Sequence, residues 1–258
     1  NTHEETLKLV RDNDFVSGQY VWTGFDYIGE PTPYGWPARS SYFGIVDLAG
    51  FPKDVYYLYK SEWSDEPVLH LFPHWNWTLG QEVDLWCYYN NADEVELFVN
   101  GVSQGIKAKT HDCLHAMWRV AYEPGTIEAV AYKDGKEVAR TARHTAGEPA
   151  QIRLSMIQYG EGASDDALVF VSVEILDNEG NLCPFAENLV NFSLEGDSAF
   201  IAGVDNGNPI SMERFKDNKR KAFYGKCLVV LQADKAGKTV LKATSPGLES
   251  AEVIFKTR

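Results

Sequence analysis

The spacing of apolar residues along the chain changes from helical to alternating near residue 64. Residues 3–13 place acidic side chains first and basic ones later, with apolar residues three apart, which predicts a short amphipathic helix. A short apolar run at 16–22 predicts a buried strand, and residues 53–63, behind the helix-starting Pro52, again show helical spacing. The first 64 residues are therefore expected to run helix, strand, loop, helix.

Beyond a polar, proline-terminated link at 64–67, apolar and polar residues alternate, which is typical of strands with one buried face. Asn100-Gly101 and Asp134-Gly135 are dipeptides of tight hairpin turns. A second link at 147–149 divides the strands into two groups, each with the count and spacing of an immunoglobulin-like sandwich. The expected strands are 68–72, 82–89, 94–99, 116–122, 125–133 and 137–144 in the first group, and 151–158, 168–176, 190–194, 227–232, 239–243 and 249–256 in the second.

Two polar stretches within the second group are expected to lie outside the strands. Residues 203–209 form a cluster of Gly, Asp, Asn and Pro, which are turn residues. Residues 212–221 carry five Lys or Arg and predict a solvated loop.

Composition narrows the classes of partner. The 258 residues include 13% aromatic residues, 21 Gly and 11 Pro, which favours many short strands over long helices. The formal charge of −13, with no basic run to offset it, opposes nucleic acid and anionic membrane surfaces. No apolar run approaches the roughly 18 to 20 residues that span a bilayer. We therefore expect no nucleic-acid partner and no membrane insertion.

The cysteine pattern gives no support for a metal site. Cys87, Cys113, Cys183 and Cys227 are scattered without a Cys-x-x-Cys pair, and Cys87 and Cys227 lie in alternating apolar runs typical of buried free thiols. The acidic stretches 177–181 and 205–208 do not match a twelve-residue calcium loop and are interpreted as hairpin turns. We expect neither a metal nor a cofactor.

The stretch 18–33, GQYVWTGFDYIGEPTP, leads on to SYFGIVD at 41–47. Together they resemble the eighth strand and loop of the catalytic (β/α)8 barrel in family 2 glycoside hydrolases of the β-galactosidase type. Residues 227–248 resemble the last β-domain of the bacterial enzymes. The fold class implied is mainly β, with residues 1–64 as the terminal segment of a TIM barrel (its last β/α repeat), 65–147 as an immunoglobulin-like β-sandwich and 148–258 as a second one.

The resemblance also implies a function and a set of site residues. Trp22 would lie at the floor of the sugar site, where an indole face suits the C–H face of galactose. Asp26 and Glu30 could accept hydrogen bonds from sugar hydroxyls, or could satisfy amides of their own loop. Arg39 could brace that loop by pairing with a carboxylate, or be solvated.

A retaining glycosidase uses two carboxyl groups, and in this family both are Glu on earlier barrel strands, one of them after an Asn. The first 64 residues contain no Asn-Glu pair, and the pair Asn178-Glu179 falls in a predicted turn. The expected catalytic set within this chain is therefore none. The parent enzyme would cleave terminal β-galactosides of an oligosaccharide or glycan, with an upstream barrel domain of the same polypeptide, and the chain alone would be inactive.

Other functions remain open for the sandwiches. His74, Trp75 and Trp77 lie in a predicted loop and could form a glycan-binding or adhesive platform, or could pack the sandwich. Alternation places Trp86 and Tyr88 on one face of a strand and their neighbours on the other, so one set is expected in the core. The sandwiches could instead be structural supports of the barrel. Accessory sandwiches on a carbohydrate enzyme suggest a periplasmic or secreted bacterial protein.

Overall fold

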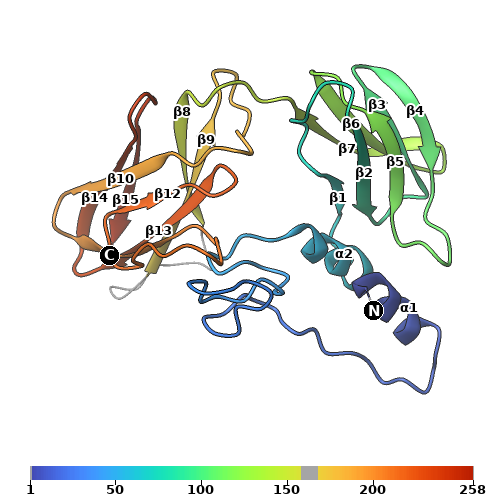
Figure 1. Ribbon diagram of the computed structural model, residues 1–258, viewed down its shortest axis with the longest axis horizontal. Helices are drawn as coiled ribbons and strands as arrows, with labels where there is room; N and C mark the ends of the chain where they lie inside the picture. The colour runs from blue at the N-terminus through green and yellow to red at the C-terminus, as the bar shows by residue number, and fades with distance from the viewer. Residues whose placement is uncertain (1, 158–167, 258) are drawn as a thin grey trace. The chain divides into compact units, whose positions relative to one another are not determined.

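The computed structural model describes residues 2–157 and 168–257 and confirms a mainly β fold (Figure 1). The chain forms two compact units. Unit 1 comprises Asn1–Asp26, Phe43–Val46 and Pro52–Thr145, and unit 2 comprises Tyr27–Tyr42, Asp47–Phe51 and Ala146–Arg258. The segment 1–64 therefore divides between the two units, while each sandwich lies within one of them. The division into three domains stays a prediction.

Both expected helices are present in unit 1, as α1 (His3–Arg11) and α2 (Asp54–Trp63). A capping box starts α1, because the Thr2 hydroxyl accepts from the Glu5 amide at 3.2 Å and the Glu5 carboxylate accepts from the Thr2 amide at 2.7 Å. The strand expected at 16–22 is wrong, because these residues form no ladder with any other described residue. A strand exists only with a partner, and apolar character alone does not supply one.

The sandwich of unit 1 consists of two antiparallel sheets, and the expected strands of this group are confirmed. Both predicted hairpin turns have the positive φ values that their sequences favour: 49° and 79° at Asn100-Gly101, and 50° and 71° at Asp134-Gly135. A further strand, β4, pairs with β3 although all its residues are exposed. In spatial order the first sheet is β1 (Leu69–Phe72), β2 (Glu82–Tyr89) and β5 (Ala116–Ala121), and the second is β4 (Val102–Lys107), β3 (Glu94–Val99), β6 (Thr126–Lys133) and β7 (Lys136–His144).

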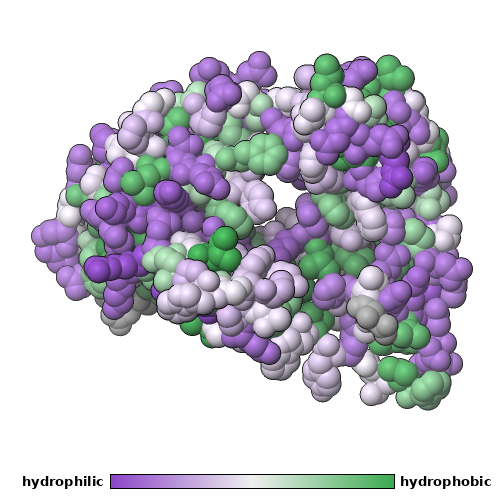
Figure 2. Space-filling model, in the orientation of Figure 1, coloured by the Kyte–Doolittle hydropathy of each residue, from purple (hydrophilic) through white to green (hydrophobic). Residues whose placement is uncertain are grey.

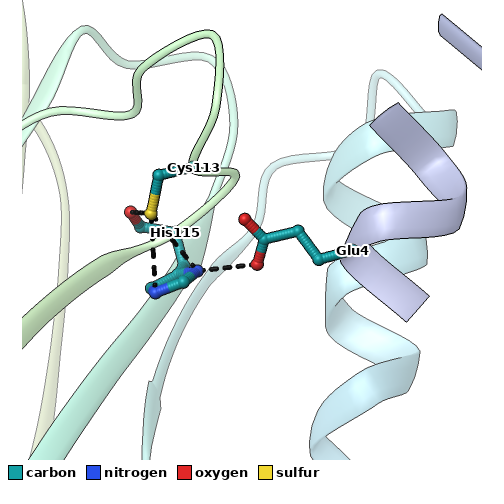
Figure 3. A group of neighbouring side chains, drawn as sticks. All are labelled: Glu4, Cys113 and His115. Atoms are coloured by element: carbon teal, nitrogen blue, oxygen red, sulfur yellow. Dashed lines mark hydrogen bonds and ion pairs between the residues drawn. The ribbon is translucent and has the colours of Figure 1, made fainter. Parts of the chain in front are cut away.

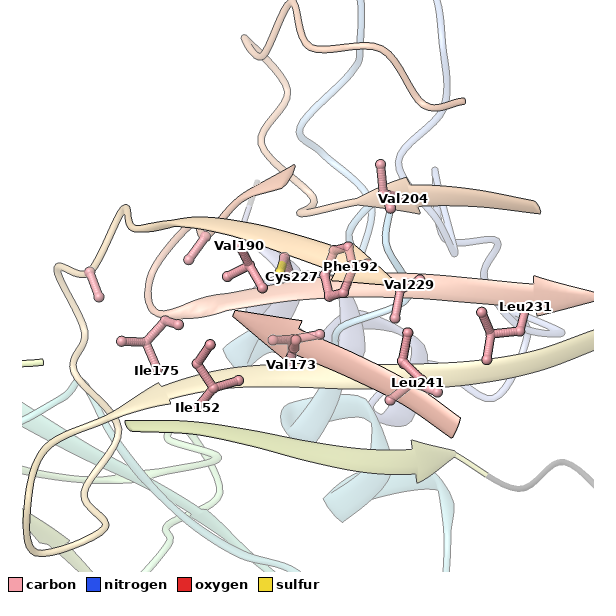
Figure 4. Close-up of a cluster of buried hydrophobic side chains, with 14 of the residues drawn as sticks. Ile152, Val173, Ile175, Val190, Phe192, Val204, Cys227, Val229, Leu231 and Leu241 are labelled. Atoms are coloured by element: carbon pink, nitrogen blue, oxygen red, sulfur yellow. The ribbon is translucent and has the colours of Figure 1, made fainter. Parts of the chain in front are cut away.

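The sandwich of unit 2 also has two sheets, and its predicted strands are confirmed where the structure describes them; residue 158 of the first one lies outside the described residues. Val173, Val229, Phe192 and Leu241 point into the space between the sheets and are buried (Figure 4). One sheet has the order β12 (Lys219–Lys221), β10 (Leu189–Glu195), β14 (Gly237–Thr244), β15 (Ala251–Thr257), and the other β11 (Ala199–Asp205), β13 (Lys226–Ala233), β9 (Leu168–Leu176), β8 (Gln151–Ile157).

The two polar stretches of unit 2 correct the sequence interpretation. The turn cluster 203–209 begins inside β11, which pairs with β13. The predicted solvated loop 212–221 ends in β12, where Arg220 is only 1% exposed. The interpretation of this segment as fully solvated is therefore wrong. The number of charged residues in a segment does not reveal whether one of them, here Arg220, has buried acceptors for its hydrogen bonds.

Hydrophilic side chains cover most of the visible surface of each unit, consistent with the acidic composition (Figure 2). Among the described residues, no helix is both long enough and apolar enough to cross a bilayer. The apolar residues gather instead in the cores of the two sandwiches and in a smaller cluster that includes Leu7, Leu58 and Leu114.

Candidate functional site

Trp22 lies at the start of a loop that backbone hydrogen bonds hold in place. The Ile45 amide donates to the Thr23 carbonyl at 3.0 Å, and the Asp26 amide donates to the Val46 carbonyl at 2.9 Å. The Trp22 side chain is 73% exposed. This sequence-predicted residue is therefore not part of a described core.

Gly44 permits the close approach of the two segments in this loop. A Cβ at position 44 would lie 2.3 Å from the Asp26 nitrogen and 2.4 Å from the Phe25 carbonyl carbon, both of them backbone atoms. Real Cβ atoms do not come so close, so any other residue would push the loop open. This close backbone contact, which is possible because Gly44 has no side chain, sets the path of the chain immediately after Trp22.

Asp26 is a buried brace of the Trp22 loop. Its residue is 4% exposed, one carboxylate oxygen accepts from the Gly44 amide at 2.7 Å, and the other accepts from the Lys53 ammonium at 2.7 Å. Of the two alternatives for Asp26, the structure shows the one in which it satisfies a loop amide. Because its oxygens point into the protein, Asp26 fixes the loop and does not present a carboxylate at the surface.

Glu30 lies in unit 2 and is exposed. Its backbone has a φ of 48°, and its carboxylate accepts a hydrogen bond from the Tyr27 hydroxyl. The Gly29 amide donates to the Arg39 carbonyl at 2.7 Å, so this part of the loop is tied to the segment that carries Arg39. Contact of Glu30 with a sugar stays a prediction.

Arg39 does brace its loop, but through a backbone group and a ring. Its guanidinium donates to the Glu213 carbonyl at 2.8 Å and lies 4.8 Å from the centre of the Phe215 ring, a cation–π distance. The hydrogen-bond partner of Arg39 is thus a carbonyl oxygen, whereas the bracing role expected from the sequence used a carboxylate. A residue more than 170 positions away supplies it, so no local pattern could have named it.

The aromatic loop of the first sandwich is not an open platform. Trp75 is 1% exposed and packs edge-on against Tyr122 in the core, so of its two alternatives the structure shows the one in which it packs the sandwich. His74 and Trp77 are half-buried and stack on each other at 4.6 Å. Burial lowers the pKa of His74, which favours the neutral ring. A glycan contact at His74 and Trp77 stays a prediction.

The faces of β2 separate as alternation predicted. Cys87 and Tyr89 are buried in the sandwich core, while Trp86 and Tyr88 lie on the other side, against His115. This side of the strand packs on residues of α1 and α2, since Tyr88 shares a buried cluster with Leu7 and Leu58. The aromatics of β2 therefore build the interior of unit 1.

The acidic turns have carboxylates that already have partners. Asp177 accepts from the amides of Gly147, Glu179 and Asn181. Burial raises the pKa of Asp177, but these hydrogen bonds outweigh it and the pKa lies below the usual range. Glu179 of the Asn-Glu pair thus belongs to a hydrogen-bonded turn after β9 and not to a barrel strand.

Sequence reasoning missed two residues that hold the loops. The sequence pattern identifies Lys53 only as the start of a helix, and Arg220 only as one of five basic residues in a predicted loop. Lys53 lies 27 positions from Asp26, and Arg220 lies 15 positions from its partner Asp205. Neither spacing belongs to a local motif, so no sequence signal marks these ion pairs.

Comparison with known proteins finds a matching family profile for each of the two sandwiches. The profile of the family described as glycoside hydrolase family 2 C-terminal domain 5 matches residues 152–254, and a domain of unknown function, DUF4982, matches residues 80–139. These ranges fall in the second and first sandwich, respectively.

The relatives extend the likeness beyond the two ranges that the family profiles match. A protein of Bacteroides ovatus named beta-galactosidase BoGH2A is 71% identical over 97% of this chain, and a putative beta-glucuronidase of Formosa agariphila is 41% identical over 88%. The crystal structure of a beta-glycosidase from Bacteroides vulgatus matches 99% of this chain with a TM-score of 0.90 and 36% identity. The chain spans only 30%, 22% and 33% of these proteins, respectively.

Proposed function

Because this chain belongs to glycoside hydrolase family 2 as a carboxyl-terminal portion of such an enzyme, we propose that the whole protein is a retaining β-galactosidase. In this proposal a barrel domain upstream in the same polypeptide provides the two catalytic carboxyl groups, and the substrate is an oligosaccharide or glycan with a terminal β-galactoside. The mechanism is a double displacement through a glycosyl-enzyme. The two sandwiches are accessory domains that support the barrel.

The exposed indole of Trp22 carries the proposal at the level of the site. A loop braced by Gly44, Asp26 and Lys53 fixes the backbone that follows Trp22, a residue that is itself 73% exposed. Tyr20 and Phe25 nearby in the chain are also exposed, at 104% and 61%. Apolar rings on a fixed loop suit the C–H face of a pyranose and the packing of further barrel strands.

The choice of galactose over other sugars rests on the relatives. The protein with 71% identity is named a beta-galactosidase, whereas a more distant one with 41% identity is named a putative beta-glucuronidase. A glucuronide carries a carboxylate that a galactoside lacks, and its recognition needs a cationic partner in the sugar site. The proposal therefore predicts a preference between these two substrates.

The test compares hydrolysis of chromogenic β-galactoside, β-glucuronide and β-mannoside by this chain and by the same chain extended upstream through a complete barrel. We expect activity only in the extended protein and the highest kcat/KM on the β-galactoside. Turnover by the chain alone would contradict the claim that both catalytic carboxyl groups lie upstream. A higher kcat/KM on the glucuronide or mannoside would overturn the choice of sugar.

A variant pair tests the role of Trp22 in the extended protein. Trp22→Ala is expected to lower kcat/KM at least about tenfold, because the sugar loses an apolar face in the transition state. Trp63→Ala removes another exposed indole of unit 1, on α2, and is expected to leave kcat/KM unchanged. Equal losses in both variants would assign the effect to folding and would remove Trp22 from the sugar site.

A further inference from the structure

Three side chains with the chemistry of zinc ligands lie together in unit 1. Glu4 stands in the first turn of α1, and Cys113 and His115 lie just before and at the entry to β5. One ligand atom from each residue lies within 4.8 Å of the other two. Figure 3 shows the Glu4 carboxylate extending from the helix toward the His115 imidazole. The sulfur of Cys113, which precedes β5, lies above the imidazole ring in this view.

The helix and the loop that carry these residues are fixed to each other. The Leu114 amide donates to one oxygen of Glu4 at 2.6 Å, and the Lys8 ammonium donates to the Asp112 carbonyl at 2.6 Å. Leu7 and Leu114 share a buried cluster. Segments about 110 residues apart in the chain are therefore held in one place, so the three side chains meet through the fold.

The imidazole of His115 is oriented from both sides. Its Nδ1 lies 2.8 Å from the second oxygen of Glu4, and its ring stacks on Trp86 with 4.0 Å between ring centroids. The side chains of His115 and Glu4 are 13% and 16% exposed. The pair is thus largely shielded from water but still within reach of a small ion.

We propose that Glu4, Cys113 and His115 bind a Zn²⁺ ion through a carboxylate oxygen, the thiolate sulfur and Nδ1, with water as the fourth ligand. Carboxylate, thiolate and imidazole in a tetrahedron are a donor set typical of zinc, and the nitrogen and sulfur ligands disfavour calcium and magnesium. On binding, the thiol proton and any proton shared between Glu4 and His115 leave to solvent.

Two of the distances between ligand atoms can be compared with those of such a tetrahedron. With ordinary zinc bond lengths, a nitrogen and a sulfur ligand lie about 3.5 Å apart and a nitrogen and an oxygen about 3.3 Å. The Cys113 sulfur is 3.6 Å from Nδ1, and the Glu4 oxygen is 2.8 Å from it, the shorter spacing of a hydrogen bond. The carboxylate must therefore withdraw by about half an ångström to admit the ion.

One side chain must also rotate. The Cys113 sulfur is 3.5 Å from Nε2 as well as 3.6 Å from Nδ1, so it lies over the ring and not beside a single nitrogen. Cys113 lies outside the core and is partly exposed, so rotation about its Cα–Cβ bond moves the sulfur toward the edge that carries Nδ1. The other oxygen of Glu4 keeps its hydrogen bond from Leu114, which orients the carboxylate as outer partners do in metal sites.

The ion would clamp α1 to the first sandwich. Glu4 belongs to the helix, whereas Cys113 and His115 belong to the sandwich side, so one ion links the two. Because zinc would bind these residues as a set only in the folded protein, it would raise the thermal midpoint of unfolding. This role is independent of the proposed hydrolase activity and does not depend on the sugar site.

The experiment titrates the protein with ZnCl2 by calorimetry and, separately, with Co²⁺ followed by absorption. We expect one equivalent of zinc bound, a thiolate-to-cobalt charge-transfer band, and a higher thermal midpoint with zinc. Cys113→Ser and Glu4→Gln should weaken zinc binding at least about tenfold while circular dichroism stays unchanged, because each replaces a ligand by a group of similar size. The cobalt spectrum of the unaltered protein tests the thiolate without any variant.

His111→Ala is the matched control. His111 is exposed and lies near Asp12 and Asp112, so it could hold a surface ion of its own. We expect zinc binding to survive this change. Absence of zinc binding, binding that Cys113→Ser leaves unchanged, a cobalt complex without the charge-transfer band, or loss of binding in His111→Ala would each overturn the proposal.

Discussion

At the scale of single residues, the Trp22 loop depends on two residues with opposite roles. Gly44 provides room, because a Cβ there would meet the backbone at Phe25 and Asp26. Asp26 provides the bonds, because it accepts from the Gly44 amide and pairs with Lys53. The backbone just after the exposed Trp22 is consequently fixed by Gly44 and Asp26, which are both buried.

Replacing Asp26 by Asn is expected to destabilise unit 1 by about 2 kcal/mol. The amide oxygen of Asn can still accept from Gly44, but its nitrogen would face the Lys53 ammonium, and the pair is mostly buried on the Asp26 side. Urea unfolding followed by tryptophan fluorescence measures the change. Glu30→Gln is the control, because Glu30 is exposed, and it should alter the free energy of unfolding by less than about 0.5 kcal/mol.

A double variant sharpens this prediction. If the loss arises from the ion pair, Lys53→Met combined with Asp26→Asn should cost less than the sum of the two single changes, since the second change removes a partner already lost. Additive losses would indicate that Asp26 and Lys53 act separately. An Asp26→Asn protein as stable as Glu30→Gln would contradict the bracing role altogether.

At the scale of elements, the strands that the sequence did not predict are β4, β11 and β12, in which no regular alternation of burial extends beyond three residues. All six residues of β4 are exposed, and β12 has only three residues. β4 is held by its hairpin with β3, and β12 by its pairing with β10. Hydrogen bonding to a neighbour can therefore define a strand that presents no apolar face.

Arg220→Met in β12 is expected to lower the stability of unit 2 by about 3 kcal/mol. Arg220 is 1% exposed and donates to Asp205 at 3.0 Å and to the Asn206 side chain at 2.9 Å. Burial already raises the pKa of Asp205, against the Arg220 charge, so removal of that charge would leave a costly carboxylate inside the protein.

Arg214→Met provides the comparison for Arg220 because it changes an exposed arginine of the same segment. It should shift the midpoint of chemical unfolding very little, within about 0.5 kcal/mol. If both arginine variants lose the same stability, the effect belongs to the net charge of the segment. A silent Arg220→Met would show that the buried ion pair contributes nothing beyond its packing.

At the scale of the whole molecule, stability depends on two sandwich cores that contain neutral thiols. Cys87 is fully buried in unit 1, and Cys227 is fully buried in unit 2. Burial raises the pKa of Cys87 to about 12 and that of Cys183 to about 11. The cores therefore exclude thiolates at pH values where an unfolded chain would already form them.

Alkaline pH is expected to destabilise the protein through these groups. The folded pKa of Cys87, about 12, lies above the unfolded value of about 8.5, so its contribution is complete below pH 8.5 and is lost as the pH rises toward 12. The loss is about 1.4 kcal/mol per pH unit for each such thiol. Urea unfolding at pH 8, 9 and 10 measures the slope.

Cys87→Ala separates the thiol from the other groups. This variant has a small cavity and is expected to be less stable at pH 8, yet to lose less stability between pH 9 and pH 10 than the unaltered protein, because one buried thiol is gone. Identical slopes in the two proteins would show that Cys87 does not titrate differently in the folded and unfolded states.

Much of the architecture could be predicted because it depends on local patterns. Alternation located most strands of the two cores and separated Cys87 from Trp86, since a strand's side chains point to opposite faces. The Asn-Gly and Asp-Gly dipeptides placed two turns, since they tolerate positive φ. Patterns failed at 16–22 and left two alternatives open at Trp75, where the outcome depends on which distant segment lies alongside.

The candidate site shows the same difference between what local patterns predict and what distant contacts decide. The chain's own sequence determined most of the sandwich strands and the two helices, because periodicity, capping and turn residues act over a few positions. Only the tertiary structure decided that Asp26 is buried against Lys53, that Arg220 is buried against Asp205, and that Glu4 meets Cys113 and His115. These contacts join residues far apart in the chain, and their energies depend on burial and geometry that exist only once the segments have packed together.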